Sequence, residues 1–101
     1  MDRSYFDVYL GNALFEARVV KRISQEQMAN MTNEVWLSDP DCQRKNGCSR
    51  STYTRYERGE ISMPMGFYKS ACKVLNLDWK QLFKEAQAFE FNHIDEIDKD
   101  K

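Results

Sequence analysis

Hydrogen-bonding and basic side chains are concentrated between Gly47 and Gly59. Gly47 can adopt the backbone angles of a tight turn, Ser49 can cap the start of a helix, and Gly59 can end it. Tyr53 and Tyr56 are three residues apart, so they share one face that can point inward. The opposite face is left with polar and basic residues: Arg50, Ser51, Thr54, Arg55 and Arg58. Such a helix suits either insertion into a DNA major groove or an ordinary solvated surface, and this stretch alone favours neither.

The remaining residue types argue against an enzyme and against a metal site. His93 is the single histidine, which removes most acid–base and nucleophile arrangements. The sequence contains no glycine-rich phosphate loop and no paired metal motif. Cys42 and Cys48 can in principle bridge or share a metal, but a zinc site needs about four ligands. With Cys72 the cysteine count is odd, which does not suit a disulfide framework. We therefore expect three free or buried thiols, no catalytic residue, no metal and no cofactor.

The length of 101 residues suits one domain with one core. The net charge is −1, but its distribution is uneven. Basic residues exceed acidic ones by two through Ala86, and acidic residues exceed basic ones by three from Gln87 onward. We therefore expect a domain over residues 1–86 and an acidic extension over residues 87–101, helical at its start and then frayed. No apolar run is long enough to span a bilayer and no signal-peptide pattern is present, so the sequence predicts a cytoplasmic chain.

Five helices and no strand are predicted, which makes the fold class all-α. Apolar residues recur at helical spacing from about Ser4 to Arg22, and Tyr68, Ala71, Cys72 and Leu75 form the inward stripe of a helix over residues 65–75. Ser24 and Gln27 have the spacing of a capping box at the start of the second helix. Asp78 can cap the fifth helix, which carries Trp79, Leu82, Phe83, Ala86 and Phe89.

The segment between Asn30 and Asn46 is less regular. Its first part, through Leu37, can extend the second helix by two turns before Pro40 stops it. Val35, Trp36 and Leu37 either seal the core or form a partner surface, and we expect the core. Arg44 and Lys45 lie in a basic turn that either contacts a phosphate backbone or is solvated.

The order of these parts resembles the Cro/repressor-type, or Xre-like, family of helix-turn-helix DNA-binding proteins. The resemblance covers roughly residues 8–84. Its specific part is the run SRSTYTRYERG from Ser49 to Gly59, and the run SQEQMA from Ser24 to Ala29 supports it independently. The resemblance implies a five-helix repressor-like domain, here with an insertion between the second and third helices.

The resemblance also implies roles for individual residues. In the family the third helix reads double-stranded DNA, usually as part of a homodimer. The DNA-contacting positions implied by the resemblance would be Gln25, Arg50, Ser51, Thr52, Thr54, Arg55 and Arg58. From their own residue types we add Ser49 at the start of the helix and Arg44 and Lys45 in the basic turn as candidate DNA contacts. Arg50, Ser51 and Thr52 would face base edges, and Gln25 and Arg58 would contact phosphates. Arg18 and Glu57 would form a structural ion pair between the first and third helices.

Three features depart from the family pattern. Seventeen residues separate Ala29 from Gly47, whereas the family turn needs about three. Arg22 stands where the family often has a glycine, and Tyr53 is larger than the usual aliphatic residue behind the reading helix. The expected function is a sequence-specific transcriptional regulator, a repressor of phage or mobile-element type. The alternative is an antitoxin-like or inhibitory protein-interaction module, with a partner on residues 35–37 or on the C-terminal extension.

Overall fold

Five helices and no strand make up the described part of the chain, which is residues 4–42 and 46–99, with side chains described up to His93. In this computed structural model the helices are α1 (Tyr5–Val20), α2 (Gln25–Leu37), α3 (Arg50–Glu57), α4 (Met65–Leu75) and α5 (Trp79–Lys99). The prediction of an all-α chain is confirmed. No helix in the described residues combines the length and the apolar character needed to cross a membrane.

The helix starts follow from local capping residues. The Ser24 side chain accepts a hydrogen bond from the Gln27 backbone N–H, and the Gln27 side chain accepts one from Ser24, so the predicted capping box is present. The Ser49 side chain caps α3 by accepting from the Thr52 N–H at 3.1 Å. Asp78 accepts from the backbone N–H groups of the first turn of α5, as expected.

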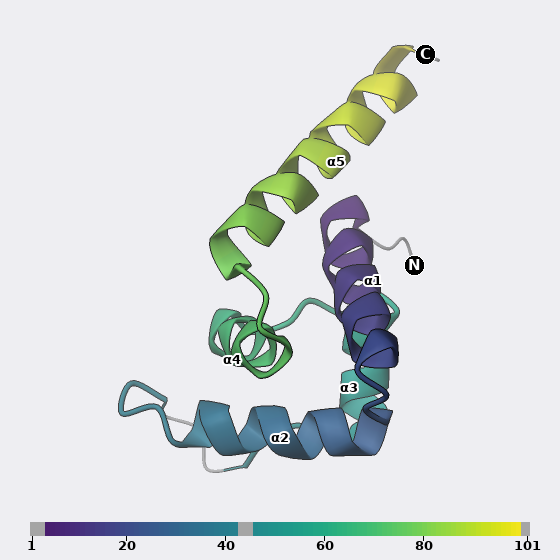
Figure 1. Ribbon diagram of the computed structural model, residues 1–101. Helices are drawn as coiled ribbons and strands as arrows, with labels where there is room; N and C mark the ends of the chain where they lie inside the picture. Colours follow the sequence, from purple (N-terminus) through teal and green to yellow (C-terminus); the bar gives the residue numbers. More distant parts are fainter. Residues whose placement is uncertain (1–3, 43–45, 100–101) are drawn as a thin grey trace.

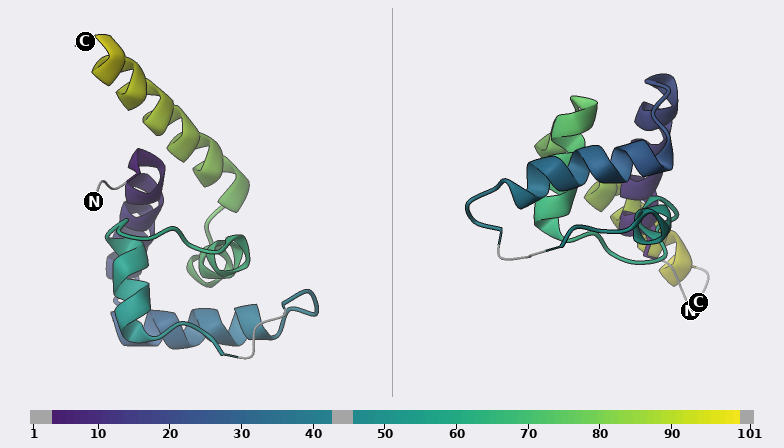
Figure 2. Two further views of the ribbon diagram at one scale, coloured as in Figure 1. Left: turned by 180° about the vertical axis from the view of Figure 1, so that it is seen from behind. Right: turned by 90° about the horizontal axis from the view of Figure 1, so that it is seen from below.

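One core joins all five helices. α1 lies beside both α3 and α5, and α2 packs on α4 (Figures 1 and 2). Each helix sends apolar side chains inward, and the fully buried ones include Leu14, Met28, Tyr53, Phe67 and Leu75. The core accommodates the large Tyr53 because its ring packs toward Phe67 of α4, with ring centroids 6.2 Å apart.

Gly11 allows α1 and α3 to approach closely. A Cβ atom at this position would lie 2.4 Å from the backbone oxygen of Glu57 and 2.6 Å from that of Tyr56. Neither neighbour can move without shifting the end of α3, so no side chain fits at residue 11. The orientation of α3 is therefore fixed partly by backbone-to-backbone packing against α1.

The corner between α1 and α2 is built without a glycine. Arg22 has a φ of 59°, in the left-handed region that favours glycine. The Ile23 N–H donates to the Arg18 carbonyl at 3.1 Å, which closes the end of α1. The backbone at residue 22 thus has a conformation that is typical of glycine, although the residue is an arginine.

The expected extension of α2 is confirmed, since the helix continues to Leu37. Trp36 is only 5% exposed and its ring meets Phe67 edge to face, with centroids 5.5 Å apart. Val35 is half-buried and Leu37 is 39% exposed. The added turns of α2 therefore contribute Trp36 to the core, but the expectation that Leu37 also belongs to the core is wrong, since its side chain faces outward.

The acidic extension begins inside α5. The helix is uninterrupted from Trp79 to Lys99, further than the expected helical start. The Glu90 carboxylate accepts hydrogen bonds from the Ser4 hydroxyl at 2.9 Å and from the Phe6 N–H at 3.1 Å. Phe89 packs on Tyr5 and Tyr9. The part of the extension up to His93 thus packs against the start of α1.

Candidate nucleic-acid interface

α3 separates its residues cleanly into an inner and an outer face. Tyr53, Tyr56 and Glu57 are buried, at 0%, 6% and 7% exposure. The outer residues Arg50, Ser51, Arg55 and Arg58 are exposed, whereas Thr52 and Thr54 are half-buried. The left view of Figure 2 shows α3 on the near side, with no other helix in front of it. The basic face predicted from the sequence is therefore open to a partner.

The Arg18–Glu57 ion pair holds α3 against α1, as the resemblance implied. The Arg18 Nε and Nη2 atoms donate to the two Glu57 carboxylate oxygens at 2.9 and 2.8 Å. Arg18 Nη1 also donates to the Ile23 carbonyl at 2.8 Å, which ties the pair to the corner before α2. Burial raises the pKa of Glu57, but hydrogen bonds, chiefly from Arg18, lower it more, so this pKa lies below its usual value.

Gln25 is bound to α3. Its Nε2 donates to Glu57 Oε1 at 3.3 Å, and its Oε1 lies 3.0 Å from the donating Thr54 hydroxyl. The Thr54 hydroxyl is also 3.0 Å from the Arg50 carbonyl. Two residues expected to contact DNA are thus joined to each other across the α2–α3 contact. The sequence could not indicate this contact, because glutamine and threonine side chains also occur commonly on solvent-exposed helix faces.

Ser49 and Thr52 organise the start of α3. Besides capping the Thr52 N–H, the Ser49 hydroxyl donates to Thr52 Oγ1 at 3.1 Å. Ser49 is exposed and Thr52 is half-buried, so both lie at the rim of the outer face next to Arg50.

Arg50 and Arg55 of α3, with Arg58 directly after the helix, provide the positive charge of this face. Arg50 and Arg58 have no ion-pair partner among the described residues, and Arg55 Nε lies 3.8 Å from a Glu60 carboxylate oxygen. The Arg55 side chain is 58% exposed, and an ion pair this exposed contributes little. Positive charge therefore remains available along the outer face. The other predicted basic contacts, Arg44 and Lys45, lie outside the described residues.

Asn33 of α2 holds the segment that leads into α3. Its Nδ2 donates to the Cys48 carbonyl at 2.9 Å, and its Oδ1 accepts from the Cys48 N–H at 3.0 Å. A Cβ atom on Gly47 would lie 2.2 Å from Asn33 Cγ. Gly47 was expected to supply turn angles, but Gly59 is the only described glycine with positive φ, so Gly47 instead provides room for Asn33. Sequence reasoning missed Asn33 altogether.

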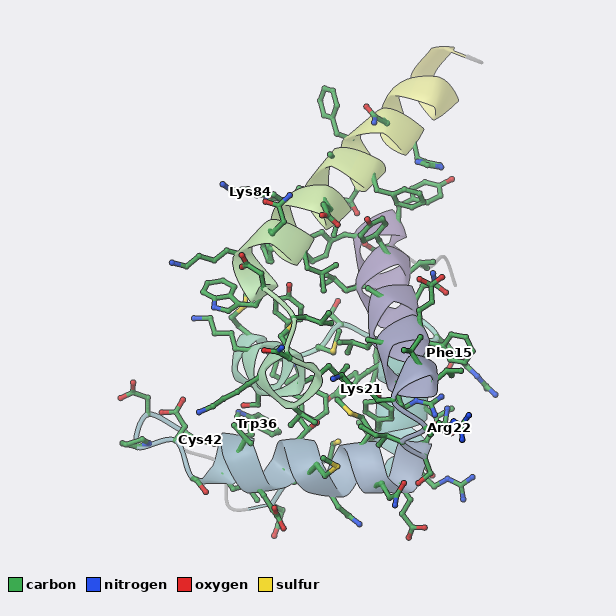
Figure 3. All side chains as sticks on the ribbon, viewed as in Figure 1. Phe15, Lys21, Arg22, Trp36, Cys42 and Lys84 are labelled. Atoms are coloured by element: carbon green, nitrogen blue, oxygen red, sulfur yellow. The ribbon has the colours of Figure 1, made fainter. Side chains whose placement is uncertain are left out.

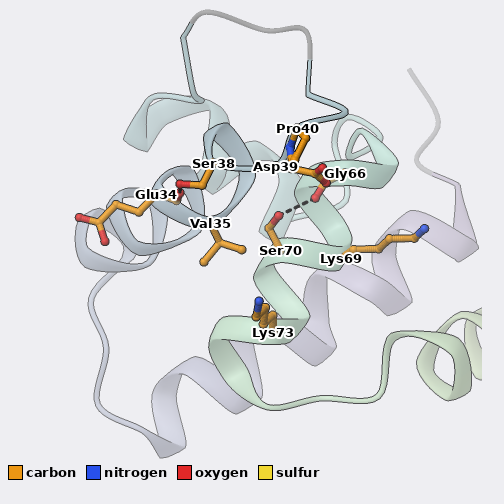
Figure 4. A pocket seen from close by; sticks show the side chains of 9 residues that line it. All are labelled: Glu34, Val35, Ser38, Asp39, Pro40, Gly66, Lys69, Ser70 and Lys73. Atoms are coloured by element: carbon orange, nitrogen blue, oxygen red, sulfur yellow. Dashed lines mark hydrogen bonds between the residues drawn. The ribbon is translucent and has the colours of Figure 1, made fainter.

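A groove beside α4 and a buried thiol of α4 also carry polar or reactive groups. A groove of about 600 Å³ lies between the end of α2 and α4, with Glu34, Asp39, Lys69 and Lys73 around it (Figure 4). Acidic and basic side chains alternate around this groove, so it has no single charge. The Ser70 hydroxyl, which lines the groove, donates a hydrogen bond to the Gly66 carbonyl. The Cys72 thiol is buried, which raises its pKa to about 11 and keeps it in the unreactive protonated form.

No group of metal-binding side chains occurs within residues 4–42 and 46–93. Comparison of the chain with protein-family models, with curated proteins and with solved structures finds no match.

Proposed function

We propose that the chain is a sequence-specific double-stranded DNA-binding transcriptional regulator of the Cro/repressor type. In this proposal α2, the long connection and α3 form an enlarged helix-turn-helix, and α3 enters the major groove. The observation that carries the proposal is the division of α3 into an anchored inner face and an open arginine-bearing outer face. Two outward arginines on this eight-residue helix, and a third directly after it, suit contacts to base edges and to the phosphate backbone.

The three arginines have different roles in this proposal. Arg50 is the first residue of α3, where a side chain can make a bidentate contact to guanine O6 and N7. Arg58 follows the last turn and suits a phosphate, and Arg55 lies between them. Gln25 and Thr54 act chiefly by bracing α3 against α2, which changes their expected role as direct contacts. As in related repressors, two copies would bind spaced half-sites.

The proposal is tested by selecting bound sequences from a random duplex pool and then titrating the selected duplex and a random one at two salt concentrations. Affinity should fall steeply as salt rises, because arginine–phosphate contacts release counterions. Arg50→Ala should weaken binding to the selected duplex by about 1–3 kcal/mol and reduce discrimination. Arg58→Ala should weaken both duplexes alike.

Lys84→Ala is the matched control, because Lys84 is an exposed cation on α5 (Figure 3), away from α3. It should leave both affinities unchanged. Equal losses on the two duplexes for Arg50→Ala and Arg58→Ala would contradict the division of roles. Equal losses for all three variants would show that only the total charge matters.

The second candidate is an antitoxin-like or inhibitory protein-interaction module on the same scaffold. Two observations favour it. Gln25 and Thr54 already form hydrogen bonds within the protein, and the isoelectric point of the sequence is about 5.8. This candidate predicts no salt-dependent DNA affinity at all, so the same titration separates the two functions.

A further inference from the structure

The connection between α2 and α3 is too long to position α3 by itself. It runs from Ser38 to Ser49, whereas a helix-turn-helix turn of three or four residues leaves the second helix little freedom. A connection of this length does not set the start of the following helix in the way that a three- or four-residue turn does. Some other contact must therefore set where α3 begins.

Asn33 provides such a contact. Its side-chain amide pairs with both the N–H and the carbonyl of Cys48, fifteen residues along the chain, in a part-buried setting. Two hydrogen bonds from one rigid amide fix the Cys48 backbone in distance and in direction. A Cβ atom on Gly47 would lie 2.2 Å from Asn33 Cγ, so a larger residue at position 47 would displace this amide. Asn33 thus holds the backbone at Cys48, and Gly47 leaves room for it.

The residues held by Asn33 are those that lead directly into the outer face of α3. Cys48 precedes the N-cap Ser49, and Ser49 precedes Arg50, the first helical residue. We propose that Asn33 is a positioning residue that fixes the start of α3, and with it Arg50, for sequence-specific DNA contact, in place of a tight turn, while the Arg18–Glu57 pair holds the end of the helix. This inference rests on the proposed function, because it names the device that gives the proposed reading helix its place.

The test compares Asn33→Ala and Asn33→Asp with the control Asn30→Ala, using the duplex selected by the wild-type protein and a random duplex. Asn30 is an exposed asparagine on the same helix and makes no described hydrogen bond. Asn33→Ala should bind the selected duplex about tenfold more weakly, since a displaced bidentate contact costs about 1–3 kcal/mol. Binding to the random duplex should change less than about twofold, because the arginines remain.

Asn33→Asp separates positioning from folding. It keeps the acceptor for the Cys48 N–H but places a second acceptor against the Cys48 carbonyl, which repels it, so its selectivity should fall below that of wild type. Circular dichroism and the thermal midpoint would report whether each variant is folded. If Asn33→Ala fails to fold, the selectivity of folded Asn33→Asp relative to wild type decides the matter.

Wild-type selectivity in a folded Asn33→Ala, or equal losses on both duplexes, would overturn the positioning role while leaving the proposed function in place. A wild-type protein without salt-dependent DNA binding would overturn both. Loss of selectivity for Asn33→Ala with full selectivity for Asn30→Ala would support the inference.

Discussion

The ion pair between Arg18 and Glu57 is a main contact between α1 and α3. Their side chains are 11% and 4% exposed, so each charge depends on the other for compensation. Removing one partner of a buried pair costs more than the pair contributes, because the remaining charge stays buried without a counter-charge. This link is what keeps the inner face of α3 in place while its outer face stays open.

Glu57→Gln should lower the free energy of unfolding by about 3 kcal/mol at neutral pH, measured by urea denaturation. Glu26→Gln is the matched control, because Glu26 is an exposed carboxylate on α2 and its neutralisation should cost less than about 1 kcal/mol. Similar losses for the two variants would show that the burial of Glu57 is unimportant.

The same substitution should change the dependence of stability on pH. The pKa of Glu57 is lowered in the folded protein, so its contribution is complete above the unfolded value of roughly 4.3. It is then lost as the pH falls through the lower folded pKa. Wild type should therefore lose stability over this acidic range more steeply than Glu57→Gln. Equal slopes for the two proteins would contradict a lowered pKa.

Arg22 tests how much the glycine-like corner costs. A residue other than glycine in the left-handed region lowers the stability of the folded protein by roughly 1 kcal/mol. Glycine avoids this strain, but it makes the unfolded chain more flexible, which also lowers stability. Arg22→Gly should therefore leave the free energy of unfolding unchanged or slightly raised. Lys21→Gly, at the neighbouring right-handed position, should lower it by about 0.5–1 kcal/mol. Thermal unfolding of both variants measures the difference, and an equal loss in both would show that the φ of Arg22 carries no strain.

Among the helices, α2 is longer than a helix ending at Ala29 would be, and its added turns form the first part of the long segment before α3. Trp36 belongs to the core and Leu37, next to it, is partly exposed. Trp36→Ala should lower the free energy of unfolding by about 3–5 kcal/mol through the cavity it leaves beside Phe67. Leu37→Ala should cost clearly less. A small effect of Trp36→Ala in urea denaturation would mean that the extension of α2 is dispensable.

The helices were predictable because their signals are local. The Ser24–Gln27 capping box and the apolar stripe of α4 depend on neighbours within one or two turns, and the predicted bounds of α4 are those observed. The Arg18–Glu57 pair was found only through the family resemblance, because its partners lie 39 residues apart.

The contacts of Asn33 and Gln25 could not be predicted in the same way. An amide is compatible with solvent, with a phosphate or with a distant backbone group, so its residue type does not choose among them. Only the folded arrangement of α2, α3 and the connection brings Cys48 to Asn33 and Thr54 to Gln25.

At the scale of the whole molecule, α5 connects the two ends of the described chain. Glu90 receives hydrogen bonds from Ser4 and Phe6 at the start of α1, where an anion also complements the positive helix end. Phe89 and His93 pack with Tyr5 beside this contact. The change in charge at residue 87 therefore does not coincide with the end of the packed structure, and the division at residues 86 and 87 can be tested by truncation.

A chain ending at Ala86 should be less stable than one ending at His93 by at least about 2 kcal/mol, because it loses the charge-assisted bonds of Glu90 and the aromatic contacts of Phe89. The chain ending at His93 keeps every described contact between α5 and α1, so it should match the full chain within about 1 kcal/mol. Urea denaturation of the three chains at one pH measures these differences. Glu90→Ala in the full chain isolates the carboxylate contribution, while Gln87→Ala, at an exposed position of the same helix, is its control. Equal stability of the chains ending at residues 86 and 93 would place the end of the folded unit at Ala86, and the charge distribution would then mark a true structural boundary.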